Sequence, residues 1–174
     1  NTASWEYYMG KNKFVDKIRN IESSRYIITP DTEKEFKIFP EDRGVLKSHY
    51  AALFGLYAAG GMEVMRVIHY ENFSSILYST QSLEEAKRYL DISGIGYLIT
   101  INNIEDKDFK CLENISSGAK PVYLYEYLKA PGRFLMFNDA IYVDKTKDAV
   151  KKLTDKSVDL RSTLVLIGRN EKQQ

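Results

Sequence analysis

Histidine and cysteine, the side chains most often used as metal ligands and nucleophiles, are scarce in this sequence. His49 and His69 are the only histidines, and Cys111 is the only cysteine. Zinc ligands usually come in pairs roughly two to five residues apart, a spacing that these three residues do not provide. Cys111 lies in a stretch that reads as a half-buried strand, which favours a packed thiol over an activated nucleophile. We therefore expect no catalytic residue and no metal site, and His49 is a candidate either for lining a pocket or for an ordinary hydrogen bond.

Phosphate-binding loops are also missing from the sequence. Gly94-Ile95-Gly96 precedes a predicted strand and lacks the third glycine of a dinucleotide-binding fingerprint. This position favours a structural turn from helix to strand. No Walker A sequence occurs. The sequence thus predicts no nucleotide cofactor, and nothing in it points to another cofactor.

Aromatic side chains are the more unusual chemical feature, since the chain has 13 tyrosines, 8 phenylalanines and 1 tryptophan. Three of the tyrosines, Tyr123, Tyr125 and Tyr127, alternate along one predicted strand and therefore share a face. Such a face can stack on a sugar ring, because tyrosine combines an apolar ring with a polar hydroxyl. It can equally pack beneath a helix or against a partner domain. Tyr123 and Tyr125 are candidate substrate-binding residues on the first interpretation.

The elements that must position these residues are clearest in the second half of the chain. Ser82-Leu83-Glu84-Glu85 is a capping box that starts a helix, and Asp144 is the predicted N-cap of another. Apolar or alternating runs predict strands over residues 96–101, 122–127, 134–137 and 163–167. In the N-terminal part we expect a helix over 13–21 and a hairpin whose strands are residues 25–29 and 35–39.

Together these elements predict an α/β (α+β) fold with a mixed sheet of about five to six strands flanked by short helices. We expect a single domain over residues 1–174, in which residues 1–43 form an N-terminal helix and hairpin and residues 44–174 form the main α/β part.

Composition excludes several classes of partner. The 25 basic and 24 acidic residues are finely interspersed, so no basic stripe predicts nucleic-acid binding. Every apolar run, such as residues 51–57, is far shorter than the roughly 20 residues that cross a bilayer. The chain begins at Asn1 without an initiator methionine, and we expect it to be a piece of a longer protein.

Three segments resemble a known family of large bacterial multi-pass membrane proteins. These segments are Leu90-Asp91-Ile92-Ser93-Gly94-Ile95-Gly96-Tyr97-Leu98-Ile99, Val122-Tyr123-Leu124-Tyr125-Glu126 and Ala130-Pro131-Gly132-Arg133-Phe134. In order and spacing they are similar to elements of the YfhO-type family, which is related to GT-C glycosyltransferases. The resemblance covers residues of about 45–168. The chain departs from the family at two positions. Gly132 separates Pro131 from Arg133. Gly96 stands where the family has a lysine, so a ligand role of that lysine does not transfer to this chain.

The resemblance implies a domain on the extracytoplasmic face of the bacterial cytoplasmic membrane, attached to the transmembrane part of the same parent chain. It implies a polyprenyl-linked sugar as donor, with the catalytic acid in a loop that this chain does not contain. The chain itself would be non-catalytic and would shape or recognise the acceptor, a cell-envelope glycan. Arg133 would contact a phosphate or carboxylate of the substrate, or pair with an acidic neighbour.

Two other interpretations remain open at this point. The chain could be a protein-interaction module of a membrane protein, without affinity for glycans. It could also be a free-standing soluble α/β protein whose likeness to the family is accidental.

Overall fold

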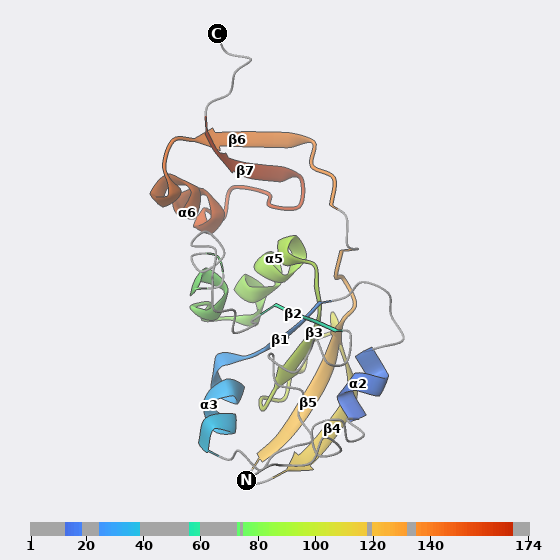
Figure 1. Ribbon diagram of the computed structural model, residues 1–174. Helices are drawn as coiled ribbons and strands as arrows, with labels where there is room; N and C mark the ends of the chain where they lie inside the picture. The colour runs from blue at the N-terminus through green and yellow to red at the C-terminus, as the bar shows by residue number, and fades with distance from the viewer. Residues whose placement is uncertain are drawn as a thin grey trace. The chain divides into compact units, whose positions relative to one another are not determined.

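A computed structural model describes residues 13–18, 25–38, 56–59, 73, 75–117, 120–131 and 135–168. The chain is an α+β protein with a mixed five-stranded sheet, a separate two-stranded sheet and a few short helices (Figure 1). Its backbone divides into two compact units, each described by itself below. The first unit is residues 1–62 and 94–133, and the second is residues 63–93 and 134–174. The expectation of a single domain stays a prediction.

The first unit is built on the five-stranded sheet. Its elements in chain order are α2 (Lys13–Ile18), β1 (Arg25–Ile28), α3 (Pro30–Ile38), β2 (Tyr57–Ala58), β3 (Ile95–Thr100), β4 (Phe109–Ser117) and β5 (Lys120–Tyr127). The strand order is β2-β1-β3-β5-β4. β1 runs parallel to both β2 and β3, whereas β5 is antiparallel to β3 and β4. The fold class expected from the sequence is confirmed.

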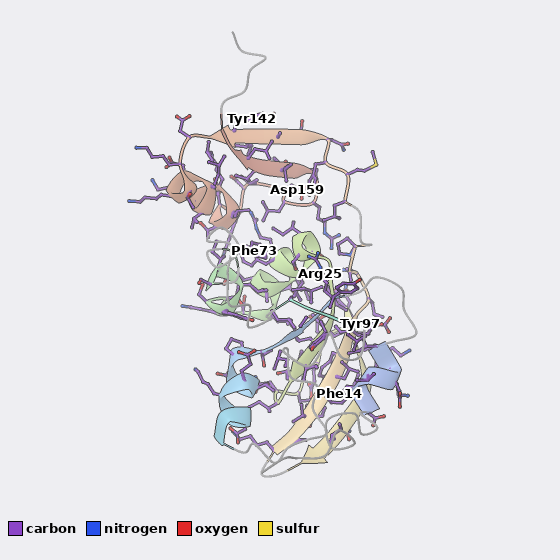
Figure 2. The ribbon with its side chains drawn as sticks, in the orientation of Figure 1. Phe14, Arg25, Phe73, Tyr97, Tyr142 and Asp159 are labelled. Atoms are coloured by element: carbon purple, nitrogen blue, oxygen red, sulfur yellow. The ribbon has the colours of Figure 1, made fainter. Side chains whose placement is uncertain are left out.

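One side of this sheet forms the apolar core of the first unit. Its strands contribute Tyr26, Ile28, Tyr97, Ile99, Val122 and Leu124, and α2 covers them with Phe14, Val15 and Ile18. Phe14 and Tyr97 are labelled in Figure 2. Because side chains alternate along a strand, residues 123, 125 and 127 of β5 must lie on the opposite side. The prediction that the three tyrosines share one face of the strand is therefore confirmed.

The predicted N-terminal hairpin is wrong, because residues 30–38 form a helix and the expected strand over 35–39 does not exist over its described part. The signals for a helix were present: Thr29 precedes Pro30, which suits the first helical position, and Asp31 and Glu33 lie in the first turn. The Glu33 amide donates to the Thr29 carbonyl oxygen at 3.0 Å and closes that turn. Period-two alternation over five residues was too short to decide against these end signals.

The second unit contains α5 (Leu83–Ser93), β6 (Asp139–Val143), α6 (Thr146–Thr154) and β7 (Thr163–Ile167), and residues 75–78 are also helical. β6 and β7 pair in parallel, from Asp139 opposite Thr163 to Val143 opposite Ile167, with α6 as the connection between them. The Arg88 guanidinium of α5 donates a hydrogen bond to the carbonyl oxygen of Asp155, just beyond the end of α6. This bond connects α5 to the β6–α6–β7 segment of the second unit.

The capping box before α5 is confirmed in its first half. The Glu85 amide donates to the Ser82 hydroxyl oxygen at 3.2 Å, and the Glu85 carboxylate accepts from the Gln81 amide at 3.2 Å. The Glu85 carboxylate thus reaches back to the amide of the residue that precedes Ser82. Gly94 ends the helix in the left-handed region, at φ 64°.

Two further expectations in the second unit are wrong. Residues 135–137 are not a strand, and Met136 is 92% exposed. The strand lies a few residues later, at β6, where the backbone finds a partner in β7. Asp144 does not cap α6, because the N-cap is Lys145 and no side chain bonds there.

Within the parts of the chain that the structure describes, no helix has the length and apolar character that a membrane crossing requires.

Candidate functional site

The side of the first unit's sheet that carries the alternating tyrosines is the strongest candidate for a binding surface. The strand register defines it, because residues directly opposite one another share a face. Tyr123 lies opposite Thr100 of β3 and Asn114 of β4, and Tyr125 lies opposite Leu98 and Cys111. Tyr127 lies opposite Phe109 and stacks on it, with ring centroids 4.9 Å apart. We call this side of β3, β5 and β4 the tyrosine face.

The middle of the tyrosine face, around Tyr123, is accessible to solvent. Tyr125 and Tyr127 are buried, at 2% and 3% exposed, whereas Tyr123 is half-buried and Asn114 and Cys111 are exposed. The Tyr123 ring lies beside the Tyr125 ring, with centroids 5.9 Å apart. Tyr125 therefore supports Tyr123 from one side, and Asn114 borders it on the neighbouring strand. An aromatic ring next to a side-chain amide can contact a ligand through both apolar and hydrogen-bonding groups.

The hydroxyl of Tyr125 fixes the loop that follows β3. It donates to the Asn103 side-chain oxygen at 2.9 Å and accepts from the Ile104 amide at 3.0 Å. The Asn103 side-chain amide in turn donates to the Glu105 carboxylate at 3.3 Å. Burial raises the pKa of Tyr125, against a smaller lowering by the Ile104 amide. The phenol stays protonated at neutral pH and can serve as the donor that orients Asn103.

Charge is absent from the tyrosine face. Among the described residues of β3, β4 and β5, every charged side chain belongs to the other side of the sheet by register: Lys110, Glu113, Lys120 and Glu126. Lys110 lies opposite Glu126 in the strand register, and Lys120 forms an ion pair with Glu35 of α3 at 3.4 Å. A ligand on the tyrosine face would contact hydroxyl, amide and ring groups but no charged side chain of these strands.

A second candidate place is the end of the sheet where β1 and β3 finish in parallel. The connections from these two strands leave toward opposite edges of the sheet, an arrangement that often marks a ligand crevice. In this structure three threonine hydroxyls lie at this end of the sheet, where a crevice would otherwise open. Thr29 donates to Thr100 at 3.2 Å, and Thr32 bonds Thr29 at 2.7 Å.

Backbone amides complete this threonine chain. The Thr32 oxygen accepts from the Ile101 amide at 2.9 Å, and the Thr100 oxygen accepts from the Asn102 amide at 3.1 Å. Thr32 and Thr100 are 0% and 1% exposed. The hydroxyls therefore satisfy one another and join β1, α3 and β3, so this end of the sheet is a structural junction rather than a binding crevice.

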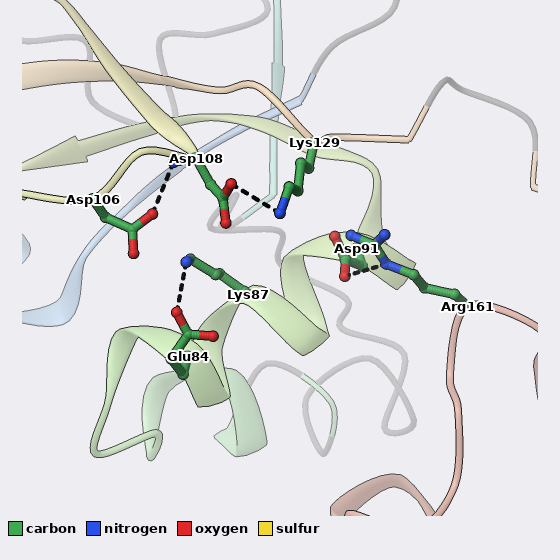
Figure 3. A network of polar contacts seen from close by, with 7 residues as sticks. All are labelled: Glu84, Lys87, Asp91, Asp106, Asp108, Lys129 and Arg161. Atoms are coloured by element: carbon green, nitrogen blue, oxygen red, sulfur yellow. Dashed lines mark hydrogen bonds and ion pairs between the residues drawn. The ribbon is translucent and has the colours of Figure 1, made fainter.

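Carboxylates are held in local contacts in both units, as Figure 3 draws. In the first unit, Asp108 pairs with Lys129 at 2.9 Å, and Asp106 accepts from the Asp108 amide at 2.8 Å. In the second unit, Glu84 pairs with Lys87 at 2.6 Å and Asp91 with Arg161 at 2.7 Å. Nowhere in the described ranges do three or more His, Cys, Asp or Glu side chains gather so as to hold a metal ion.

The residues singled out from the sequence have different outcomes. Tyr123 and Tyr125 lie together on the tyrosine face, as their alternation predicted. His49 and Arg133 lie outside the described residues. The packed thiol expected at Cys111 is wrong, because this residue is exposed on the edge strand β4, where its Sγ donates to the nearby Glu113 carbonyl oxygen at 3.7 Å. Sequence reasoning missed Asn103 and Asn114, whose roles depend on pairing between distant segments.

A search against family models, curated proteins and solved structures finds no match to this chain.

Proposed function

We propose that this chain is a non-catalytic extracytoplasmic domain of a glycosyltransferase-like membrane protein, and that it recognises the acceptor glycan in cell-envelope polysaccharide assembly. The observation that carries the recognition step is the half-buried Tyr123 ring bordered by the exposed amide of Asn114. Sugar rings present C–H groups that lie flat on an aromatic ring and hydroxyls that bond an amide. The membrane setting rests on the family resemblance of residues of about 45–168.

In this proposal the transmembrane part of the same parent chain is the permanent partner. It holds the catalytic acid and the polyprenyl-linked sugar donor, while the tyrosine face holds the acceptor. Binding is weak and reversible, because a single ring and a few amides make a small contact. Such a role needs no nucleophile or metal in this domain.

The test is a titration of the 174-residue chain with oligosaccharides prepared from bacterial envelopes, followed by amide chemical shifts in NMR spectra. We expect saturable shifts at residues of β4 and β5, and their loss in Tyr123→Ala. Tyr142→Ala is the matched control, because Tyr142 is an exposed tyrosine of β6 (Figure 2). Oligosaccharides that shift no resonance of the chain would refute the recognition role.

The membrane setting has a separate test in the reading frame around this sequence. We expect several apolar runs of about 20 residues in the same frame. A frame without such runs would leave a free-standing soluble α/β protein, the third interpretation of the sequence.

A protein-interaction module is the second candidate, favoured by the exposed apolar residues of the second unit. Tyr142 is 43% exposed, Leu164 36% and Ile167 45%. Parallel strands are usually covered on both sides, so this exposure suits a partner. On this interpretation, when the 174-residue chain and the membrane part of the parent are expressed as separate polypeptides, Tyr142→Asp abolishes their co-purification and Tyr123→Ala leaves it unchanged.

A further inference from the structure

We infer that the tyrosine face takes a neutral sugar unit, a pyranose without phosphate or carboxylate groups, with Tyr123 as the stacking residue and Asn114 as the hydrogen-bonding residue. This inference rests on the proposed function and narrows its ligand class. It follows from the strand register, from exposure and from the distribution of charge, each described above.

The geometry of the pair fits one sugar ring. Asn114 lies directly opposite Tyr123 on the adjacent antiparallel strand, so their Cβ atoms are about 4.5–5.5 Å apart. A pyranose lying on the phenol ring would bring the hydroxyls at its edge to the neighbouring amide. The Asn114 amide offers two donors and one acceptor oxygen, which suits hydroxyl groups that both donate and accept.

The charge distribution selects against anionic ligands. The described strand residues of the tyrosine face include no lysine or arginine, since Lys110 and Lys120 belong to the other side by register. A phosphate or carboxylate held there would lose hydration without gaining a cationic partner. Glu105 and Asp106, in the loop that Tyr125 positions, add negative charge near the same end of β3.

Tyr125 acts as a positioning residue in this site. Its ring supports Tyr123, and its hydroxyl holds Asn103 and Ile104. Tyr125→Phe keeps the ring but releases the loop. We expect this variant still to bind the neutral sugar. The chemical-shift changes at Tyr123 and Asn114 should be retained, whereas the change at Asn103 should be lost. A merely structural residue would not give this pattern.

The experiment titrates the 174-residue chain with three trisaccharides of similar length: one of neutral N-acetylated amino sugars, one of uronic acids, and one of neutral hexoses carrying a phosphate. The side-chain amide signals of Asn103 and Asn114 report binding at low and at moderate salt, and the backbone amide signals of β4 and β5 report it in the two Asn114 variants. We expect the neutral trisaccharide to bind about tenfold more tightly than either anionic one. Asn114→Lys should reverse this order by supplying a cation, and Asn114→Ala should weaken neutral binding only. Both substitutions are on an exposed side chain, so the fold is kept.

Each outcome decides between the proposals. Tighter binding of an anionic trisaccharide at Tyr123 and Asn114 overturns the neutral-sugar inference and leaves the proposed glycan recognition intact. Neutral binding whose shifts avoid β4 and β5 overturns the assignment of the site. If no trisaccharide or envelope oligosaccharide shifts any resonance, the proposed function itself fails, and the inference fails with it. Preferential neutral binding that Tyr123→Ala removes supports both.

Discussion

Two buried tyrosines on neighbouring strands, Tyr97 of β3 and Tyr125 of β5, provide a sharp test of how hydroxyl groups stabilise the first unit. They are 1% and 2% exposed. The Tyr97 hydroxyl has no hydrogen-bond partner among the residues that the structure describes, whereas the Tyr125 hydroxyl has two. Replacing either residue by phenylalanine removes one oxygen atom and keeps the ring. The two substitutions are therefore chemically identical and differ only in what the oxygen contacts.

We expect opposite signs for the two changes in unfolding free energy. A buried polar group without a partner costs about 1–3 kcal/mol, so Tyr97→Phe should stabilise the protein by about 1 kcal/mol. Tyr125→Phe loses two hydrogen bonds and leaves the Ile104 amide and the Asn103 side-chain oxygen with one partner fewer. At a net value of about 1 kcal/mol for each bond, it should destabilise the protein by about 1–3 kcal/mol.

Urea unfolding followed by circular dichroism measures both effects, provided that the slope with urea is the same in all three proteins. Burial, followed by the negative charge of Glu126, raises the pKa of Tyr97 from 10.0 to about 12. The folded protein thus loses stability as pH rises from 10 toward 12, and Tyr97→Phe should lose less. A Tyr97→Phe protein that is destabilised as much as Tyr125→Phe would refute the assignment of an unpartnered hydroxyl.

Three further predictions test single features of the fold. Thr32→Val should destabilise by about 1–3 kcal/mol in urea unfolding, because it leaves the Ile101 amide without its acceptor, while Thr154→Val on the exposed face of α6 should change little. Gly94→Ala should cost about 1 kcal/mol from its positive φ alone, since no atom of the described residues lies within 4 Å of the added carbon; a cost above about 3 kcal/mol would contradict this reasoning. The Ser162 hydroxyl, followed by the Arg161 amide, holds the pKa of Asp159 below its usual 3.8, so this carboxylate contributes stability that is lost as pH falls below that value. Asp159→Asn should therefore weaken the dependence of the unfolding free energy on pH in the acid range. An unchanged dependence in that range would contradict this assignment.

The sequence was sufficient for elements with strong local signals. The strands at residues 95–100, 120–127 and 163–167 are apolar or alternating runs, and α5 begins at a capping box. Each of these signals is confined to a short stretch of chain, so it can be read without knowing the rest of the fold. The alternation of Tyr123 and Tyr125 belongs to the same class, and it located half of the candidate site.

Elements that depend on a distant partner could not be predicted in the same way. β6 has two exposed residues at its start and becomes a strand only by pairing with β7, more than 20 residues later. The threonine chain joins Thr29 and Thr32 to Thr100 across a separation of about 70 residues, which no local pattern reveals. Asn114 enters the site by its register against Tyr123 alone.

One extra residue in β4 decides the character of the tyrosine face. Cys111 lies opposite Tyr125, but Glu113 lies opposite Leu124, so Leu112 is an additional residue in a bulge. A regular strand would keep residues 109, 111 and 113 on the same side, which would place Glu113 beside Tyr123 and turn Asn114 toward the core. The bulge exchanges the sides of the sheet on which Glu113 and Asn114 lie. It moves the carboxylate to the other side of the sheet and puts a neutral amide next to the half-buried ring. The absence of charge that favours a neutral sugar is therefore set by the bulge at Leu112, and not by the composition of the strand.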